Sequence, residues 1–128
     1  MKERFYIPEN LKKVPLNRKV AIELLEYVIA NQSEPAITYG KLASKADRDF
    51  NPRNLDKPLG VVSSACIENN LPPVSGVVIN KEIKLPGEGF YKEFFSGSPM
   101  GEWEEIYVKN ILAIKKCKLW KDFLDAIM

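Results

Sequence analysis

Histidine is absent from the 128 residues of this chain. Serine-histidine-aspartate and cysteine-histidine catalysis are therefore excluded, as are zinc sites that need imidazole ligands. The two cysteines, Cys66 and Cys117, are too few for a four-thiolate zinc site, and their separation fits no metal or redox motif. Cys66 is expected to be a buried structural thiol. Because no complete catalytic constellation can be assembled, the sequence predicts no enzymatic activity, no metal site and no cofactor.

Long hydrophobic runs and strong net charge are also lacking. No apolar stretch approaches the roughly 20 residues of a transmembrane helix and no secretory signal opens the sequence, so we expect a cytoplasmic protein without a membrane partner. The formal net charge of +2 neither favours nor excludes nucleic acid. The length fits a single domain, with an N-terminal arm over 1–16, a core over 17–95 and a helical extension over 96–128.

Three segments in the first half of the chain carry apolar residues at helical spacing. They predict helices over about 18–32, 39–46 and 57–69. Short polar side chains stand where the first free amides of these helices need acceptors, namely Asn17, Thr38, and either Asn54 or Asp56. The end of the chain, about 102–127, is also expected to be mostly helical.

A run of β-branched residues over 77–79 predicts a strand within 75–80, and another short strand is expected near 5–7. Residues 81–84 are expected to turn and begin a further strand, with the loop over 85–90 as a wing and 91–95 irregular. This order of elements favours an α+β winged helix, with a short β-hairpin wing and an additional C-terminal helical segment.

Several short motifs succeed one another in the central part of the chain. They are Thr38-Tyr39 ahead of Leu42-Ala43, the turn Asn51-Pro52, the step Leu59-Gly60, the run PVSGVV at 73–78, and a loop that joins glycine to an aromatic residue at 89–90. Together they resemble the DNA-binding domain of alkylguanine-DNA alkyltransferases and of their non-catalytic alkyltransferase-like relatives. The resemblance covers about residues 37–90 and implies a domain that binds duplex DNA.

The chain departs from that family at its reactive positions. Val74 stands where the family has its acceptor cysteine, Ser75 where it has the activating histidine, and Gly76 where it has an arginine. Alkyl transfer at this position is chemically impossible, because neither a thiolate nor a proton relay is present. The arginine of the family's recognition helix is also absent in strict register, and Arg53 lies about one turn away.

Ten residues are candidates for binding DNA or another ligand: Tyr39, Lys41, Arg48, Arg53, Lys57, Asn80, Lys81, Gly87, Phe90 and Tyr91. The lysines and arginines among them are of the kind that contacts DNA phosphates. Aspartates between them weaken the positive electrostatic potential, and the same pattern is also typical of a solvated loop of mixed charge. We expect Tyr39 either to place its hydroxyl on a backbone phosphate or to cover the edge of the hydrophobic core. Glycine in the 85–91 loop permits close approach of a ligand on which Phe90 or Tyr91 can stack, or the loop is an ordinary turn with buried aromatics.

These residues support two functional hypotheses. In the first, the protein binds duplex DNA without catalysis, with the helix over 57–69 in a groove and the loop over 85–91 as a wing. In the second, the chain is a small-ligand (nucleotide) or protein-binding module, such as an inhibitor or sequestering factor from a mobile element. Its pocket or interface would then be lined by Tyr39, Arg53, Asn80, Lys81 and Phe90.

Overall fold

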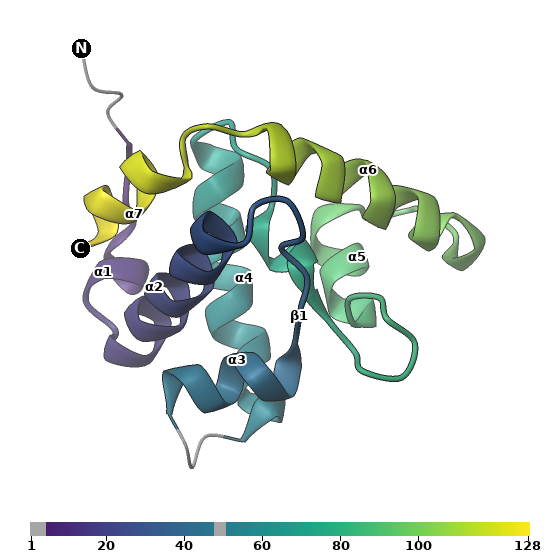
Figure 1. Cartoon of the computed structure of the whole chain (residues 1–128), viewed down its shortest axis with the longest axis horizontal. Helices are drawn as coiled ribbons and strands as arrows, with labels where there is room; N and C mark the ends of the chain where they lie inside the picture. Colours follow the sequence, from purple (N-terminus) through teal and green to yellow (C-terminus); the bar gives the residue numbers. More distant parts are fainter. Residues whose placement is uncertain (1–4, 48–50) are drawn as a thin grey trace.

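A computed structural model of the chain describes residues 5–47 and 51–128, and this part is built mainly of helices (Figure 1). The α-helices are α1 (Glu9–Lys12), α2 (Pro15–Ala30), α3 (Tyr39–Ala46), α4 (Asp56–Glu68), α5 (Glu88–Phe94), α6 (Trp103–Lys116) and α7 (Trp120–Ile127). Short 3₁₀ helices are η1 (Pro52–Leu55), η2 (Val74–Val77) and η3 (Met100–Glu102). Within the described ranges, the strands are β1 (Ile37–Thr38) and β2 (Val78–Ile79), which pair in parallel.

The prediction of an α+β winged helix is wrong, because the described structure is nearly all helical and has no β-hairpin wing. The β-branched run is largely buried and forms η2 and then β2, which pairs with the distant β1 and not with the residues that come after it. Asn80 ends β2: its side-chain oxygen accepts hydrogen bonds from the amides of Glu82 (2.8 Å) and Ile83 (3.3 Å). Such a local bond competes with strand pairing and favours a turn.

Several residues of the predicted wing, 85–91, instead form the start of helix α5. Gly87 is the N-cap of α5 and Glu88 lies in the first turn, where a carboxylate interacts favourably with the helix dipole. The segment 91–95, which we expected to be irregular, therefore mostly belongs to a helix.

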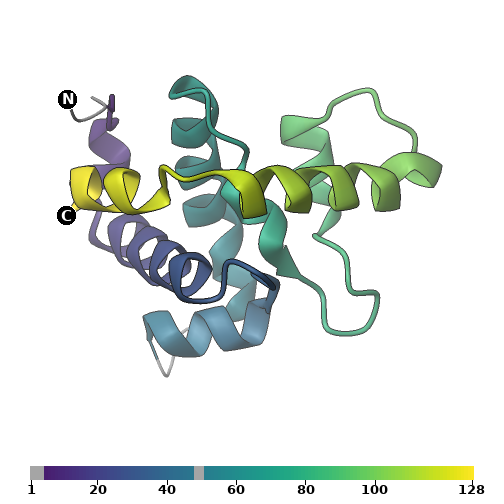
Figure 2. The same cartoon turned by 45° about the horizontal axis from the view of Figure 1, so that its top comes forward.

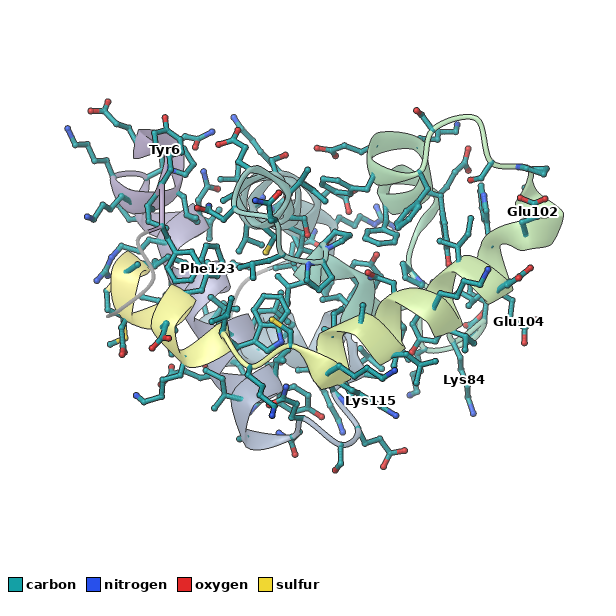
Figure 3. All side chains as sticks on the ribbon, turned by 90° about the horizontal axis from the view of Figure 1, so that it is seen from above. Tyr6, Lys84, Glu102, Glu104, Lys115 and Phe123 are labelled. Atoms are coloured by element: carbon teal, nitrogen blue, oxygen red, sulfur yellow. The ribbon has the colours of Figure 1, made fainter. Side chains whose placement is uncertain are left out.

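The N-terminal arm is part of the packed structure. Residues 5–7 form no strand, and the next helix, α1, packs on α2 and α4 with Leu11 fully buried. Tyr6 is exposed at the surface (Figure 3), but its backbone amide and carbonyl both bond to the side chain of Asn69 at the end of α4, each at 2.8 Å. These contacts anchor the arm to the end of α4.

The three helices predicted in the first half of the chain are confirmed with small shifts. Thr38 caps α3, as expected, because its hydroxyl oxygen accepts a hydrogen bond from the backbone amide of Lys41 at 3.3 Å. The cap predicted at Asn17 is wrong, because α2 begins at Pro15 and the buried Asn17 amide donates to the carbonyl of Asn10 at 2.9 Å. The caps predicted for α4 are wrong as well, since η1 runs directly into that helix.

The C-terminal segment is helical as predicted, but residues 117–119 divide it into α6 and α7. The side chain of Gln32, just after α2, donates to the carbonyls of Ile114, Lys115 and Cys117 at 3.3, 3.0 and 2.6 Å. These carbonyls lie at the end of α6 and have few partners within their own helix. The end of α6 is therefore specified by a side chain more than eighty residues earlier.

The main hydrophobic core surrounds α2, which packs against α1, α3, α4 and α7. Cys66 is fully buried in it, as predicted, and burial raises the pKa of its thiol to about 12. Figures 1 and 2 show α5 and the long α6 extending to one side of this core. In the described part of the chain, no helix is long and apolar enough to cross a membrane.

Candidate functional site

Three helices begin close to one another, at the end of the molecule where several candidate residues lie. Tyr39 is the first residue of α3, Asp56 is the first of α4, and Gly87 directly precedes α5. The amide of Gly87 donates to the Tyr39 hydroxyl oxygen at 2.9 Å and so ties the start of α5 to the start of α3. The N-terminal ends of three helices, which carry partial positive charge, therefore lie near one another.

A cavity of about 110 Å³ lies between these helix starts. Its walls combine apolar side chains, two hydroxyls, three glycines and two carboxylates: Leu59, Phe90, Phe94, Tyr39, Ser75, Gly60, Gly87, Gly89, Asp56 and Glu93. A cavity of about 150 Å³ accommodates a benzene molecule. The space between the helix starts is smaller than that, so even one small ring would extend partly through its opening.

The polar groups of the cavity can both accept and donate hydrogen bonds. Burial raises the pKa of the Tyr39 phenol, an effect that the hydrogen bond from Gly87 partly offsets and the nearby Asp56 carboxylate adds to. The hydroxyl therefore keeps its proton at neutral pH and can donate it to a ligand while it accepts from Gly87. The exposed carboxylates of Asp56 and Glu93 can accept from N–H groups of the same ligand.

Ser75 belongs to the cavity wall and is fixed by a second serine behind it. Its amide donates to the Ser63 hydroxyl oxygen at 2.9 Å, and the Ser63 hydroxyl donates to the Ser75 hydroxyl oxygen at 2.6 Å. Both residues are almost completely buried. Val74, next to Ser75, is fully buried in the hydrophobic core and does not line the cavity.

Three predicted phosphate ligands are exposed beside the cavity. Lys41 lies in the first turn of α3, Arg53 in η1 and Lys57 in the first turn of α4. Within residues 5–47 and 51–128, none of the three takes part in a salt bridge. Arg48, the fourth predicted cation of this group, lies outside the described residues.

The outer face of α4 is recessed along most of its length. Lys57, Val61, Ser64 and Glu68 line a hollow of about 330 Å³, and Pro8, Asn10 and Glu93 of α5 also belong to its lining. A second hollow of about 640 Å³ runs from Arg53 and Lys57 to the exposed Val14 and Leu16. The first turn of α4 therefore lies where both hollows meet, whereas its later turns are flanked by other elements.

The remaining candidates are Tyr91, Phe90, Asn80 and Lys81, and the first three contribute to packing or to a turn. Tyr91 is fully buried and its ring stacks on Trp103, with centroids 4.4 Å apart and an interplanar angle of 2°. Phe90 is 8% exposed and forms a cavity wall instead of a free stacking platform. Asn80 closes its turn through its side chain, and Lys81 is exposed on that turn.

Several cavity residues were not identified from the sequence, among them Leu59, Glu93 and Phe94. The last two belong to α5, which we expected to be irregular. A signal for this helix was present, because an N-terminal glycine and glutamate precede aromatic residues at helical spacing, Phe90 and Phe94. For Leu59 no local signal exists, since its place in the wall depends on α4 packing beside α5.

Across the described residues, no group of three or more cysteine and acidic side chains is placed to hold a metal ion. A scan of family models gave no match to this chain, and searches of curated proteins and of solved structures also found no similar protein.

Proposed function

We propose that this protein binds duplex DNA without catalysing a reaction on it. The observation that carries the proposal is the exposed position of Lys41, Arg53 and Lys57, without salt bridges in the described part, at the end of the molecule where α3 and α4 begin. Cationic side chains and helix N termini are the groups that contact DNA phosphates. The resemblance of residues 37–90 to alkyltransferase-like DNA-binding domains supports the same function.

The mode of binding that fits this surface is contact of helix ends with the phosphate backbone. The recessed outer face of α4 carries Glu68 and faces Glu93, so its full length does not suit insertion into a groove. The first turns of α3 and α4, with η1 between them, are the parts that carry the exposed cations. Because Asp56 lies among the cations, we expect modest affinity with little preference for sequence.

The test is a salt titration of a labelled duplex measured by fluorescence anisotropy. We expect Arg53→Ala and Lys57→Ala each to make the slope of log K against log salt shallower by about 0.9, the value for one phosphate contact. Lys118→Ala removes the same charge between α6 and α7, on the side of the molecule away from α3 (Figure 1), and should leave the slope unchanged.

Arg53 and Lys57 are both exposed, so neither substitution should affect folding. Absence of binding at low salt would contradict the proposal. Equal slopes for the wild type and both variants would remove this end of the molecule from the DNA interface.

As a second candidate function, we propose that the cavity between α3, α4 and α5 binds one planar, nitrogen-containing ring, such as a free or unpaired nucleobase. Its apolar walls suit a ring, and its volume of about 110 Å³ limits the ligand to one small ring that extends partly through the opening. The Tyr39 hydroxyl and the carboxylates of Asp56 and Glu93 fit the edge of such a ring, which carries both acceptors and N–H donors.

A thermal-shift series with free nucleobases tests this second function. A ligand present at about 100 times its dissociation constant adds about 2.7 kcal/mol of stability and raises the melting temperature by several degrees. Gly89→Leu places a side chain at the cavity wall, where a Cβ atom meets nothing within 4 Å, and should abolish the shift. Gly40→Leu is the matched control, because it is equally free of contacts and lies outside the cavity. The second function is excluded if no base raises the melting temperature, or if Gly89→Leu responds like Gly40→Leu.

A further inference from the structure

One face of α6 has no partner in the described structure. The opposite face is held by the fold: Ile114 is fully buried, and the Asn110 side chain donates to the carbonyl of Pro73 at 3.1 Å. The outward face carries Glu104, Val108, Leu112 and Lys115, all exposed. Val108 and Leu112 are 49% and 46% exposed although both are large aliphatic residues. Figure 3 shows Glu104 and Lys115 near opposite ends of this helix, at the edge of the molecule.

The spacing of these four residues places them in one stripe. Steps of four, four and three positions bring side chains to the same side of an α-helix. Along the stripe the order is acidic, aliphatic, aliphatic, basic. Glu105 and Lys116 border the stripe and repeat this polarity. The stripe therefore has two charged ends of opposite sign and an apolar centre.

A stripe of this kind is complementary to itself when the second copy runs in the opposite direction. With a two-fold axis near residue 110, Glu104 lies opposite Lys115 of the other copy, and Val108 lies opposite Leu112. The same axis brings Glu105 opposite Lys116. A parallel arrangement would instead place like charges together. Two-fold symmetry, in which the same patch serves both subunits, is the commonest arrangement of soluble oligomers.

We propose that α6 is a dimer interface that pairs with α6 of a second copy of this chain in antiparallel orientation. Within residues 5–47 and 51–128, neither Glu104 nor Lys115 has a salt-bridge partner in its own chain, so both charges are available to the other copy. The Glu105–Lys109 bridge at 3.1 Å is exposed and lies beside the stripe.

The expected dimer is weak. Fourteen helical residues span about 21 Å, so the paired helices form an interface at the small end of those that associate specifically. We therefore expect a dissociation constant in the micromolar range or above and a strong dependence on concentration. In Figures 1 and 2, α6 lies away from α3, so the dimer would leave the proposed DNA surface uncovered.

Sedimentation velocity over a range of concentrations tests the proposal. The wild type should move from the 14.6 kDa of one chain toward twice that mass as concentration rises. Glu104→Lys and Lys115→Glu each place like charges at both ends of the symmetric interface and should weaken the dimer about tenfold or more. Glu26→Lys reverses an exposed charge on α2 and serves as the control that should dimerise normally.

Mixing the two variants distinguishes this geometry from other modes of association. A heterodimer of Glu104→Lys with Lys115→Glu has opposite charges at both ends, so the equimolar mixture should dimerise better than either variant alone. The double variant Glu104→Lys/Lys115→Glu should regain the homodimer. The proposal is overturned if the protein stays monomeric at every concentration up to about 1 mM, because a dissociation constant above this value corresponds to negligible affinity. A dimer that resists both charge reversals, or a mixture that gains nothing, overturns it as well.

Discussion

Replacing Gly76 with alanine is expected to lower the free energy of unfolding by about 2–4 kcal/mol. A Cβ atom at this position would overlap the Nδ2 atom of Asn110 and lie 2.9 Å from Cζ of Phe90. Both neighbours are nearly buried, and the same Nδ2 atom donates to the carbonyl of Pro73 at 3.1 Å. The added methyl group must therefore displace a packed ring and break a buried hydrogen bond.

Urea unfolding monitored by circular dichroism measures this effect. Gly101→Ala is the matched control, because a Cβ atom there meets nothing within 4 Å, and we expect a change within about 0.5 kcal/mol. The double variant Gly76→Ala/Asn110→Ala should be more stable than the sum of its single variants predicts, since removing the Asn110 amide creates space for the methyl group. A loss below about 0.5 kcal/mol for Gly76→Ala would contradict the packing described for η2 and α6.

The same contact gives Gly76 a structural role. No side chain fits at Gly76, because Asn110 and Phe90 fill the space. The position therefore supports the attachment of α6 and α5 to η2 in this chain. An arginine could be introduced only if these neighbours also changed.

Replacing Trp120 with alanine is expected to cost about 3–5 kcal/mol, the largest effect among the substitutions considered. Trp120 is 1% exposed, and its indole nitrogen donates to the carbonyl of Ile114 at 3.0 Å. Its ring also meets Phe123 edge-on, with centroids 6.4 Å apart. The substitution removes this bond and leaves a large cavity between α7 and the core.

Because a domain of this size has about 5–15 kcal/mol of total stability, Trp120→Ala should be close to unfolding at physiological temperature. Trp120→Phe retains a ring and should lose clearly less stability, which separates the volume of the side chain from its hydrogen bond. The measurement is again the midpoint and slope of urea unfolding. Similar midpoints for Trp120→Ala and the wild type would show that α7 contributes little to the core.

The success of the sequence predictions depends on the range of the interactions involved. The helix over 39–46 was predicted with its cap, because Thr38 and Lys41, whose amide donates to the Thr38 hydroxyl oxygen, are only three positions apart. The inner face of α7 also follows from helical spacing, which places the buried Trp120, Phe123, Leu124 and Ile127 on one side of the helix. Local periodicity and local hydrogen bonds can be read from the sequence directly.

The hairpin prediction failed because strand pairing is not a local property. Residues 78–79 have high β propensity, but their partner is β1, some forty positions earlier. After β2, the chain turns at Asn80 and enters a helix just after Gly87, and no second strand follows β2 in the described residues. A run of β-branched residues predicts an extended segment without specifying its partner.

The sequence by itself determined the helices α2, α3 and α4, the helical character of the C-terminal segment and the absence of histidine-dependent chemistry, since these depend on residue type and short spacing. Only the tertiary structure decided that α3, α4 and α5 begin around one cavity, joined by the bond between Gly87 and Tyr39. It also decided which face of α6 stays free, because the inner face is selected by the burial of Ile114 and by the bond from Asn110 to Pro73. These arrangements arise from contacts between residues far apart in the chain, and no periodicity encodes such contacts.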